Sequence, residues 1–315
     1  ETATLDGFSN VRDFTSEGVV DLNGNFTTSG FQKYEGNVNL SGDTELAATT
    51  IEFEGGVDGN YRNLTLSPSS SFIKLDGITL SDVDKLTIGG DLELNGSLSA
   101  SEINIQGNTT LIGDANLTAS VVSCISVPKI DFFGTIDGGH AFALNGNVTF
   151  NGAIGDQNPL TSLTVVGGTA SLNGNVTTTG IQTYQSGSSS GDVEFNGTYI
   201  AGGGIELLGE GTFGVSLGLN GDTTIDAGTG EFSVQKGSSS THPGGNIVSQ
   251  GESYDLTITA GNITVPAGIG VAPAGSGLSS PELKDFTISG IGQVGLNTPI
   301  VSTNGDISIA RQTKI

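Results

Sequence analysis

Short runs of alternating apolar and polar residues, each followed by a turn signal, dominate this chain of 315 residues. Typical runs are Val38–Leu40, Ile103–Ile105 and Leu256–Ile258. An alternation with period two places one set of side chains inward and the other outward on a β-strand. Asp-Gly, Asn-Gly or Gly-Gly follows many of these runs, and such residues tolerate the positive φ of tight turns. The pattern predicts an all-β fold of strands about three to five residues long.

The second feature of the pattern is repetition, which is densest in residues 144–184. Within that block, Leu172–Tyr184 echoes Leu22–Tyr34, which lies 150 residues earlier, and nine of the thirteen positions are identical. The triplet Leu-Asn-Gly also begins at Leu94, Leu144 and Leu219. Other phrases return after 22, 28 or 30 residues. Repetition at such intervals is typical of a solenoid whose coils take about 20–30 residues.

A β-sandwich, an up-and-down barrel and a parallel solenoid can all be built from short strands. The aliphatic character of the apolar positions and the 51 glycines favour the solenoid, because a sandwich is expected to show more aromatic anchors and fewer glycines. We therefore expect residues 1–315 to form a single continuous parallel β-helix of about a dozen coils. Three Ser-, Gly- or Pro-containing stretches, 185–191, 237–246 and 266–282, are predicted to be surface loops.

Composition and charge exclude several classes of protein. The net charge of −23 argues against a nucleic-acid-binding protein and against docking on anionic membranes. No apolar run approaches the length of a membrane span. The one cysteine, Cys124, lies in an apolar strand pattern and is interpreted as a small buried hydrophobic residue. The chain begins with Glu1 rather than Met, so we expect a segment or processed product of a longer chain.

Recurrent asparagines suggest how the turns could stack. Asn side chains tolerate the left-handed backbone, and stacked amides can bond to one another in ladders. The sequence predicts such ladders at the positions that follow leucine in the repeated triplet, namely Asn23, Asn95, Asn145, Asn173 and Asn220.

Calcium is the candidate cofactor. Hard oxygen ligands beside flexible turns suit this cation, and two places offer them. The candidate metal ligands are Asp21, Asn23, Asn25, Asp82 and Asp84. Turn chemistry alone is the competing interpretation, since neither a complete EF-hand loop nor a nonapeptide calcium repeat is present.

Catalytic signals are weak. His140 and His242 are the only histidines, and no acidic partner is fixed for either of them by sequence. Gly187–Gly191 matches G-x-S-x-G, but it lies in a Ser-rich stretch without a following helix pattern. We expect the protein not to be an enzyme.

The block that starts at Gly146, GNVTFNGAIGDQNPLTSLTVVGGTASLNGNVTTTGIQTY, resembles the repeats of filamentous-haemagglutinin-like bacterial exoproteins and adhesins. Asn37–Thr44, Ile51–Gly59 and Arg62–Leu66 look like the next part of the same repeat. The resemblance is clear for about 22–75 and 143–195. It implies a right-handed parallel β-helix, export to the cell surface or the medium, and a very large parent chain.

Three functions follow as hypotheses. The first is a non-enzymatic structural solenoid of an extracellular fibre or sheath, which associates end to end or laterally into filaments because an open solenoid end templates stacking. The second is an adhesin stalk whose loops bind a receptor or a glycan. The third is a carbohydrate-active β-helix enzyme, which rests on fold analogy alone.

Overall fold

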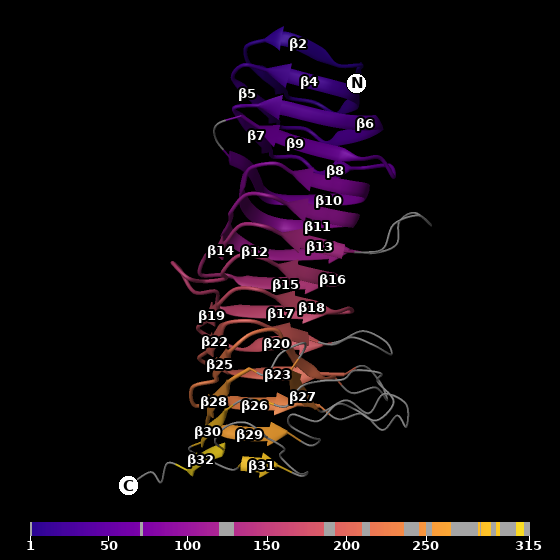
Figure 1. The fold of residues 1–315 in the computed structure, drawn as a ribbon. Coiled ribbons are helices and arrows are strands. Elements are labelled where there is room, and N and C mark those ends of the chain that lie inside the picture. Colours follow the sequence, from indigo (N-terminus) through magenta and orange to yellow (C-terminus); the bar gives the residue numbers. More distant parts are fainter. Residues whose placement is uncertain are drawn as a thin grey trace. The chain divides into compact units, whose positions relative to one another are not determined.

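The computed structural model describes residues 2–69, 72–119, 129–185, 193–209, 215–235, 246–249, 254–265, 283, 285–290, 294–296 and 307–311. Every regular element in these ranges is a β-strand, and no helix occurs in them (Figure 1). The predicted all-β class is therefore confirmed.

In chain order the strands are β1 (Ala3–Leu5), β2 (Phe8–Val11), β3 (Phe14–Ser16), β4 (Val20–Thr28), β5 (Phe31–Tyr34), β6 (Val38–Ala48), β7 (Thr50–Phe53), β8 (Val57–Asp58), β9 (Leu64–Pro68), β10 (Phe72–Ile88), β11 (Asp91–Ile105), β12 (Thr109–Ala119), β13 (Lys129–Phe132), β14 (Ile136–Asp137), β15 (Ala141–Asn145), β16 (Asn147–Phe150), β17 (Ser162–Val166), β18 (Ala170–Leu172), β19 (Val176–Thr178), β20 (Gln182–Gln185), β21 (Val193–Phe195), β22 (Thr198–Ala201), β23 (Gly204–Leu208), β24 (Leu217–Leu219), β25 (Thr223–Asp226), β26 (Glu231–Val234), β27 (Ile247–Ser249), β28 (Leu256–Ala260), β29 (Asn262–Val265), β30 (Phe286–Gly290), β31 (Val294–Leu296) and β32 (Ile307–Arg311).

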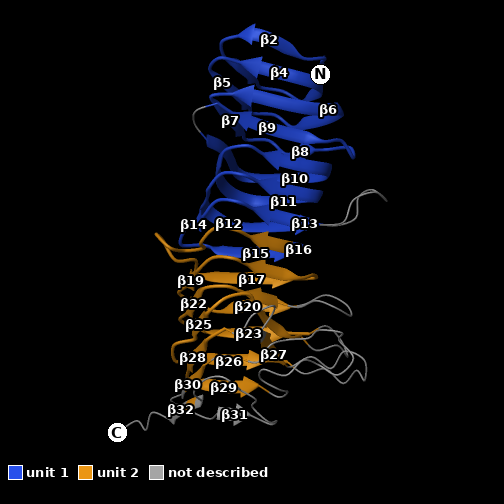
Figure 2. Cartoon of the chain, viewed as in Figure 1, with its two compact units in different colours: residues 1–147 blue, residues 148–315 orange. Residues whose placement is uncertain are grey.

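The chain separates into two compact units, residues 1–147 and 148–315 (Figure 2). In the first unit, one ladder joins β3, β5, β7, β10, β11, β12 and β14 by parallel pairing. Successive register partners along it are Thr15, Lys33, Glu52, Lys74, Glu93, Thr110 and Asp137, so the steps are 18, 19, 22, 19, 17 and 27 residues. Each step is one coil of a solenoid.

The second unit is built in the same way. One of its ladders joins β19, β22, β25, β28, β30 and β32, again in parallel. The register partners along it are Thr177, Ile200, Asp226, Thr259, Ser289 and Ala310, and the steps are 23, 26, 33, 30 and 21 residues. A β-solenoid is thus confirmed, whereas its right-handedness and the continuity of one solenoid over 1–315 stay predictions.

Alternation along each strand builds the core. In β6, for example, Val38, Leu40 and Leu46 are fully buried, while Asn39 and Glu45 next to them reach the surface. Full burial of such an aliphatic side chain contributes about 1.5–3 kcal/mol. Aromatic rings also stack between coils, which the sequence did not suggest: Tyr34 lies on Phe53 with ring centroids 5.0 Å apart.

Several predicted turns are β-bulges inside long strands, so the predicted strand length was wrong in these places. β10 has 17 residues and β11 has 15. Their pairing shifts register between Asp76 and Ile78 and again between Leu80 and Val83. A bulge bends a strand without ending it, and this lets one strand turn a corner of the coil where Asp76-Gly77 predicted a break.

Glycine has a second role at the corners, which is to permit close stacking of backbones. In the first unit a Cβ on Gly107 would overlap the backbone of Gly90 in the preceding coil, and a Cβ on Gly134 would overlap Gly107. Neither Gly107 nor Gly134 has a positive φ. These positions therefore require glycine for space rather than for conformational freedom.

The repeated segment encodes a buried hydrogen-bond network between a Gln and a Tyr side chain, here called the polar clamp, and each unit contains a copy of it. Tyr34 Oη donates to Gln32 Oε1 at 2.9 Å, and Gln32 Nε2 donates to the carbonyl oxygens of Phe26 and Ala47 at 2.9 and 3.0 Å. Both side chains are fully buried. Ala47 belongs to the following coil, so Gln32 joins two coils through the core.

The second copy repeats this arrangement. Tyr184 Oη donates to Gln182 Oε1 at 3.1 Å, and Gln182 Nε2 donates to Ile200 O at 2.8 Å. Thr178 Oγ1 lies 3.4 Å from the same nitrogen and donates to Gly180 O at 2.9 Å. The motif T-x-G-x-Q-x-Y, which both copies share, thus encodes a buried network in which the Gln and Tyr side chains have hydrogen-bond partners.

Burial raises the pKa of the Tyr34, Tyr184 and Tyr199 phenols above the usual value. These phenols therefore lose their protons at a lower pH in the unfolded chain than in the folded chain. The stability that the protonated phenols contribute is complete below about pH 10 and falls as the pH rises further. We expect three of the five tyrosines to ionise only together with unfolding in alkali. Absorbance at the phenolate band and circular dichroism, recorded in one alkaline titration, check this; ionisation of all five with the fold intact would contradict it.

Some predictions lie outside the described residues. These are the burial of Cys124, the surroundings of His242, and almost all of the three predicted loops at 185–191, 237–246 and 266–282. They stay predictions.

Candidate functional site

The first calcium candidates lie on β4, where their side chains bond to neighbouring coils. Asp21 Oδ1 accepts a hydrogen bond of 2.8 Å from Asn39 Nδ2 in the following coil. Asn23 Nδ2 donates to Asp6 Oδ1 at 3.2 Å in the preceding coil. Asn25 is exposed beside them. Two of the three predicted ligands thus already serve coil-to-coil bonding.

The second pair of candidates lies on β10. Asp82 is exposed, with a φ of 54°, and its carbonyl oxygen accepts from the Tyr61 amide at 2.6 Å. Asp84 is half-buried, and its Oδ1 is shielded from solvent without a hydrogen-bond partner. In the described ranges, no three His, Cys, Asp or Glu side chains are placed to hold one metal ion.

Calcium binding by these residues stays a prediction. If Asp84 ligates the ion, calcium raises the melting temperature of the intact protein, and the Asp84→Asn variant loses that increase while Asp6→Asn keeps it. A melting temperature that is the same in calcium and in a chelator would contradict the prediction.

The predicted asparagine ladders take a different form. Asn23, Asn95 and Asn220 each donate to a carboxylate, on Asp6, Asp76 and Glu194 respectively, at 3.2, 2.9 and 3.0 Å. Asn173 is the case that matches an amide pair, since its Nδ2 donates to Asn151 Oδ1 at 3.2 Å. A carboxylate accepts a stronger bond than an amide does, and acidic side chains thereby become part of the stack.

Lysines of the first unit pair with carboxylates on their own and adjacent coils. Lys33 Nζ lies 3.0 Å from both Glu35 and Glu54. The hydrogen bonds to Glu54 and Glu35 raise the pKa of Lys33. Lys74 bridges Glu52 and Asp76 at 3.5 Å each. Since exposed ion pairs contribute little individually, these pairs are expected to add little to the stability of the unit.

Glu102 is a carboxylate of the first unit that lies between two lysines. Burial alone would raise its pKa, but Lys85 at 3.0 Å and Lys129 at 3.4 Å outweigh burial and hold the pKa below the usual value. A general acid needs a pKa near the working pH. Glu102 is thus held ionised between two cations, which suits a structural role.

His140 is the described histidine. It is partly buried, and its Nδ1 lies 3.9 Å from Asp114 Oδ1. Asp114 Oδ1 also accepts from the Ala141 amide at 3.0 Å. This places a loose His–Asp contact at a turn. The expectation that the protein is not an enzyme stays a prediction, and the carbohydrate-active alternative stays a hypothesis.

Among the residues that the structure covers, no helix has the length and apolar character of a membrane span. Comparison of the chain with protein-family models, with curated proteins and with solved structures gave no match. The β-solenoid fold thus rests on the parallel strand pairing of this chain itself, and the resemblance to filamentous-haemagglutinin-like repeats stays a prediction from sequence.

Proposed function

We propose that this protein is a non-enzymatic structural solenoid of an extracellular or cell-surface fibre or sheath. The observation that carries the proposal is the parallel, in-register pairing of successive coils in both units. Such a stack is self-complementary, because the row of backbone groups on one edge of a coil is the partner of the opposite edge of the next. The same pairing can continue between chains.

The outward side chains support the same proposal. They lie in rows at coil spacing, as in Lys33, Glu52, Lys74 and Glu93. A row in which positive and negative side chains alternate can form ion pairs with a complementary row on a neighbouring solenoid. The net charge of −23 opposes close approach at low salt, so lateral association is expected to depend on ionic strength. The acidic composition and the sequence resemblance support an exported location.

Electron microscopy of the intact protein tests the proposal. We expect filaments or sheets at high protein concentration, and more of them at 0.15 M salt than at 0.01 M, because the screening length falls from about 30 Å to about 8 Å. Monodisperse single particles at every salt and protein concentration would contradict it. The variant Lys74→Glu, which breaks the alternating row, is expected to reduce lateral association; Lys85→Glu, which lies outside that row, is the matched control.

An adhesin stalk is the second candidate function. One described feature favours it, the exposed Tyr61 side chain on a tightly held loop of the first unit. A stalk and a fibre subunit are compatible, since a solenoid can display a binding surface along its side.

A further inference from the structure

A groove lined by both polar and apolar atoms crosses three coils of the first unit. It has a volume of about 280 Å³ and is lined by β6, β8 and β10. The polar residues around it are Asn37, Asn39, Asp58, Thr79 and Ser81. The groove lies on the outside of the strands, because Val38 and Val57 beneath it are buried in the core.

A missing side chain creates the hollow. Gly56 lies at the groove between Asn37 of the preceding coil and Thr79 of the following coil. Its amide donates to Asn37 Oδ1 at 3.0 Å, which fixes that side chain at the rim and leaves its Nδ2 as a donor. A Cβ on Gly56 would lie 3.3 Å from the Thr79 carbonyl oxygen, so a larger side chain would fill the groove.

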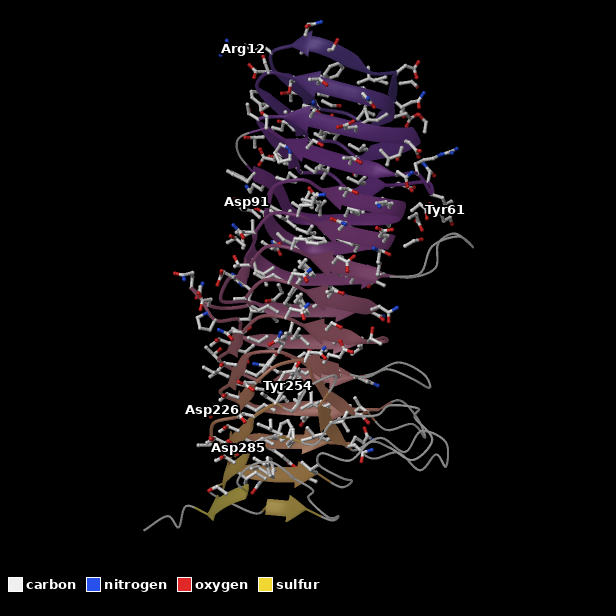
Figure 3. All side chains as sticks on the ribbon, viewed as in Figure 1. Arg12, Tyr61, Asp91, Asp226, Tyr254 and Asp285 are labelled. Atoms are coloured by element: carbon white, nitrogen blue, oxygen red, sulfur yellow. The ribbon has the colours of Figure 1, made fainter. Side chains whose placement is uncertain are left out.

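The loop that leaves the groove presents an exposed aromatic ring. It starts at Asp58, whose Oδ1 accepts from the Asn60 amide at 3.1 Å. Asn60 Nδ2 donates to Leu40 O at 3.1 Å, and the Tyr61 amide donates to Asp82 O at 2.6 Å. The loop is therefore tied to the coils on both sides of it. The Tyr61 side chain is 62% exposed and extends outward from the first unit (Figure 3).

The backbone of this loop is strained. Asn60 and Tyr61 have φ values of 44° and 59°, a region that costs a bulky residue energy. A glycine at position 61 would relieve the strain, and the chain instead holds a tyrosine there with its ring in solvent. Strain that is maintained to display a side chain is characteristic of ligand-contacting sites.

We propose that the groove and Tyr61 together form a binding site for a neutral oligosaccharide. The amides, the carboxylate and the hydroxyls of the groove can donate to and accept from sugar hydroxyls. The rigid, amphipathic tyrosine ring offers a flat surface for the apolar face of a neighbouring sugar ring. A cationic peptide is the competing ligand, because the many acidic residues of this chain would attract it, but it lacks the dense array of hydroxyls, each both donor and acceptor, that the amides and hydroxyls of the groove can pair with.

Saturation-transfer NMR on the intact protein tests the site, with neutral tetrasaccharides of glucose, N-acetylglucosamine, mannose and galactose as probes. We expect at least one probe to bind with a Kd of about 1 mM or below. Tyr61→Asn removes the ring but retains a residue that tolerates positive φ, and it is expected to weaken binding about tenfold. Gly56→Val, which fills the groove, is expected to do the same, whereas Tyr61→Phe should retain binding.

The control is Phe133→Asn, since Phe133 is another aromatic residue of the first unit that is 52% exposed. It should leave the affinity unchanged, and thermal unfolding shows whether each variant folds. Failure of every sugar to bind at about 10 mM, or an equal affinity in Tyr61→Asn and the parent chain, would overturn the proposal. Tyr61-dependent binding of an oligolysine peptide without sugar binding would overturn it as well. Filament formation is scored separately, so the proposed structural role can hold or fail independently.

Discussion

Replacing Gly107 by alanine is expected to destabilise the first unit by about 3 kcal/mol or more. The new Cβ would overlap the backbone of Gly90 in the preceding coil, and a backbone cannot move aside as the end of a side chain can. The coils would have to separate, which weakens the backbone hydrogen bonds on both sides of the corner. Urea unfolding followed by circular dichroism measures the loss.

Gly89→Ala is the matched control for this prediction. Gly89 lies at a corner of the same kind and also lacks a positive φ, but its Cβ would approach nothing more closely than Leu66 O at 3.3 Å. We expect a change of about 0.5 kcal/mol at most. If the two variants lose equal stability, close backbone stacking is not the reason for glycine at position 107.

The second large effect is expected from Gln182→Leu in the second unit. The substitution leaves the Tyr184 hydroxyl and the Ile200 carbonyl oxygen without the partners they have now. Each unsatisfied buried group costs about 1–3 kcal/mol, so a loss of about 2–6 kcal/mol in the free energy of unfolding is expected from the two groups together. Thermal and urea unfolding measure it.

A double-mutant cycle with Tyr184→Phe separates the clamp from simple packing. Because Tyr184→Phe removes the hydroxyl that Gln182→Leu strands, the double variant should lose about 1 kcal/mol less than the sum of the single variants. Gln185→Leu, on the same strand but only half-buried, is the control and should change stability by about 0.5 kcal/mol at most. Additive losses in the cycle would show that the two side chains do not act together.

The repeating pattern was sufficient to predict the fold class, because alternation and recurrence are properties of the backbone arrangement itself. The strand at Leu256–Ile258 was predicted correctly, and the strand at Val38–Leu40 was placed correctly but is longer than predicted, since β6 continues to Ala48. The echo of Leu22–Tyr34 in Leu172–Tyr184 correctly marked equivalent structure. The structural role of the repeated Gln and Tyr could not be predicted, because the residue types alone do not show that both side chains point into the core.

Turn signals were the least reliable guide. Asn-Gly and Asp-Gly tolerate positive φ in a bulge as readily as in a turn, so Asp76-Gly77 gave no sign that β10 continues through it. The Leu-Asn-Gly triplet also occurs with more than one backbone conformation. Gly96 has a φ of 128°, whereas Gly174 has no positive φ and lies against Gly152 O, which its Cβ would approach to 2.6 Å.

The groove beside Tyr61 was not predicted because it depends on three coils at once. Asn37, Gly56 and Thr79 are about twenty residues apart, and their juxtaposition follows from register. Coil lengths vary from 17 to 27 residues in this unit, so the sequence alone does not give that register. The positive φ of Tyr61 carries no sequence signal at all, since tyrosine is not a residue that favours it.

Parallel, in-register stacking is the central claim, and pulsed electron resonance of spin-label pairs in the first unit measures it most directly. One label is placed at Thr15 and the second at Glu93, Thr110 or Asp137, in a chain whose Cys124 is replaced by serine. These positions lie four, five and six steps along one ladder from Thr15. At a strand spacing of about 4.8 Å, the distances should rise evenly through about 19, 24 and 29 Å. Distances that stay equal or decrease along this series would mean that the chain folds back on itself, and the solenoid account would be wrong.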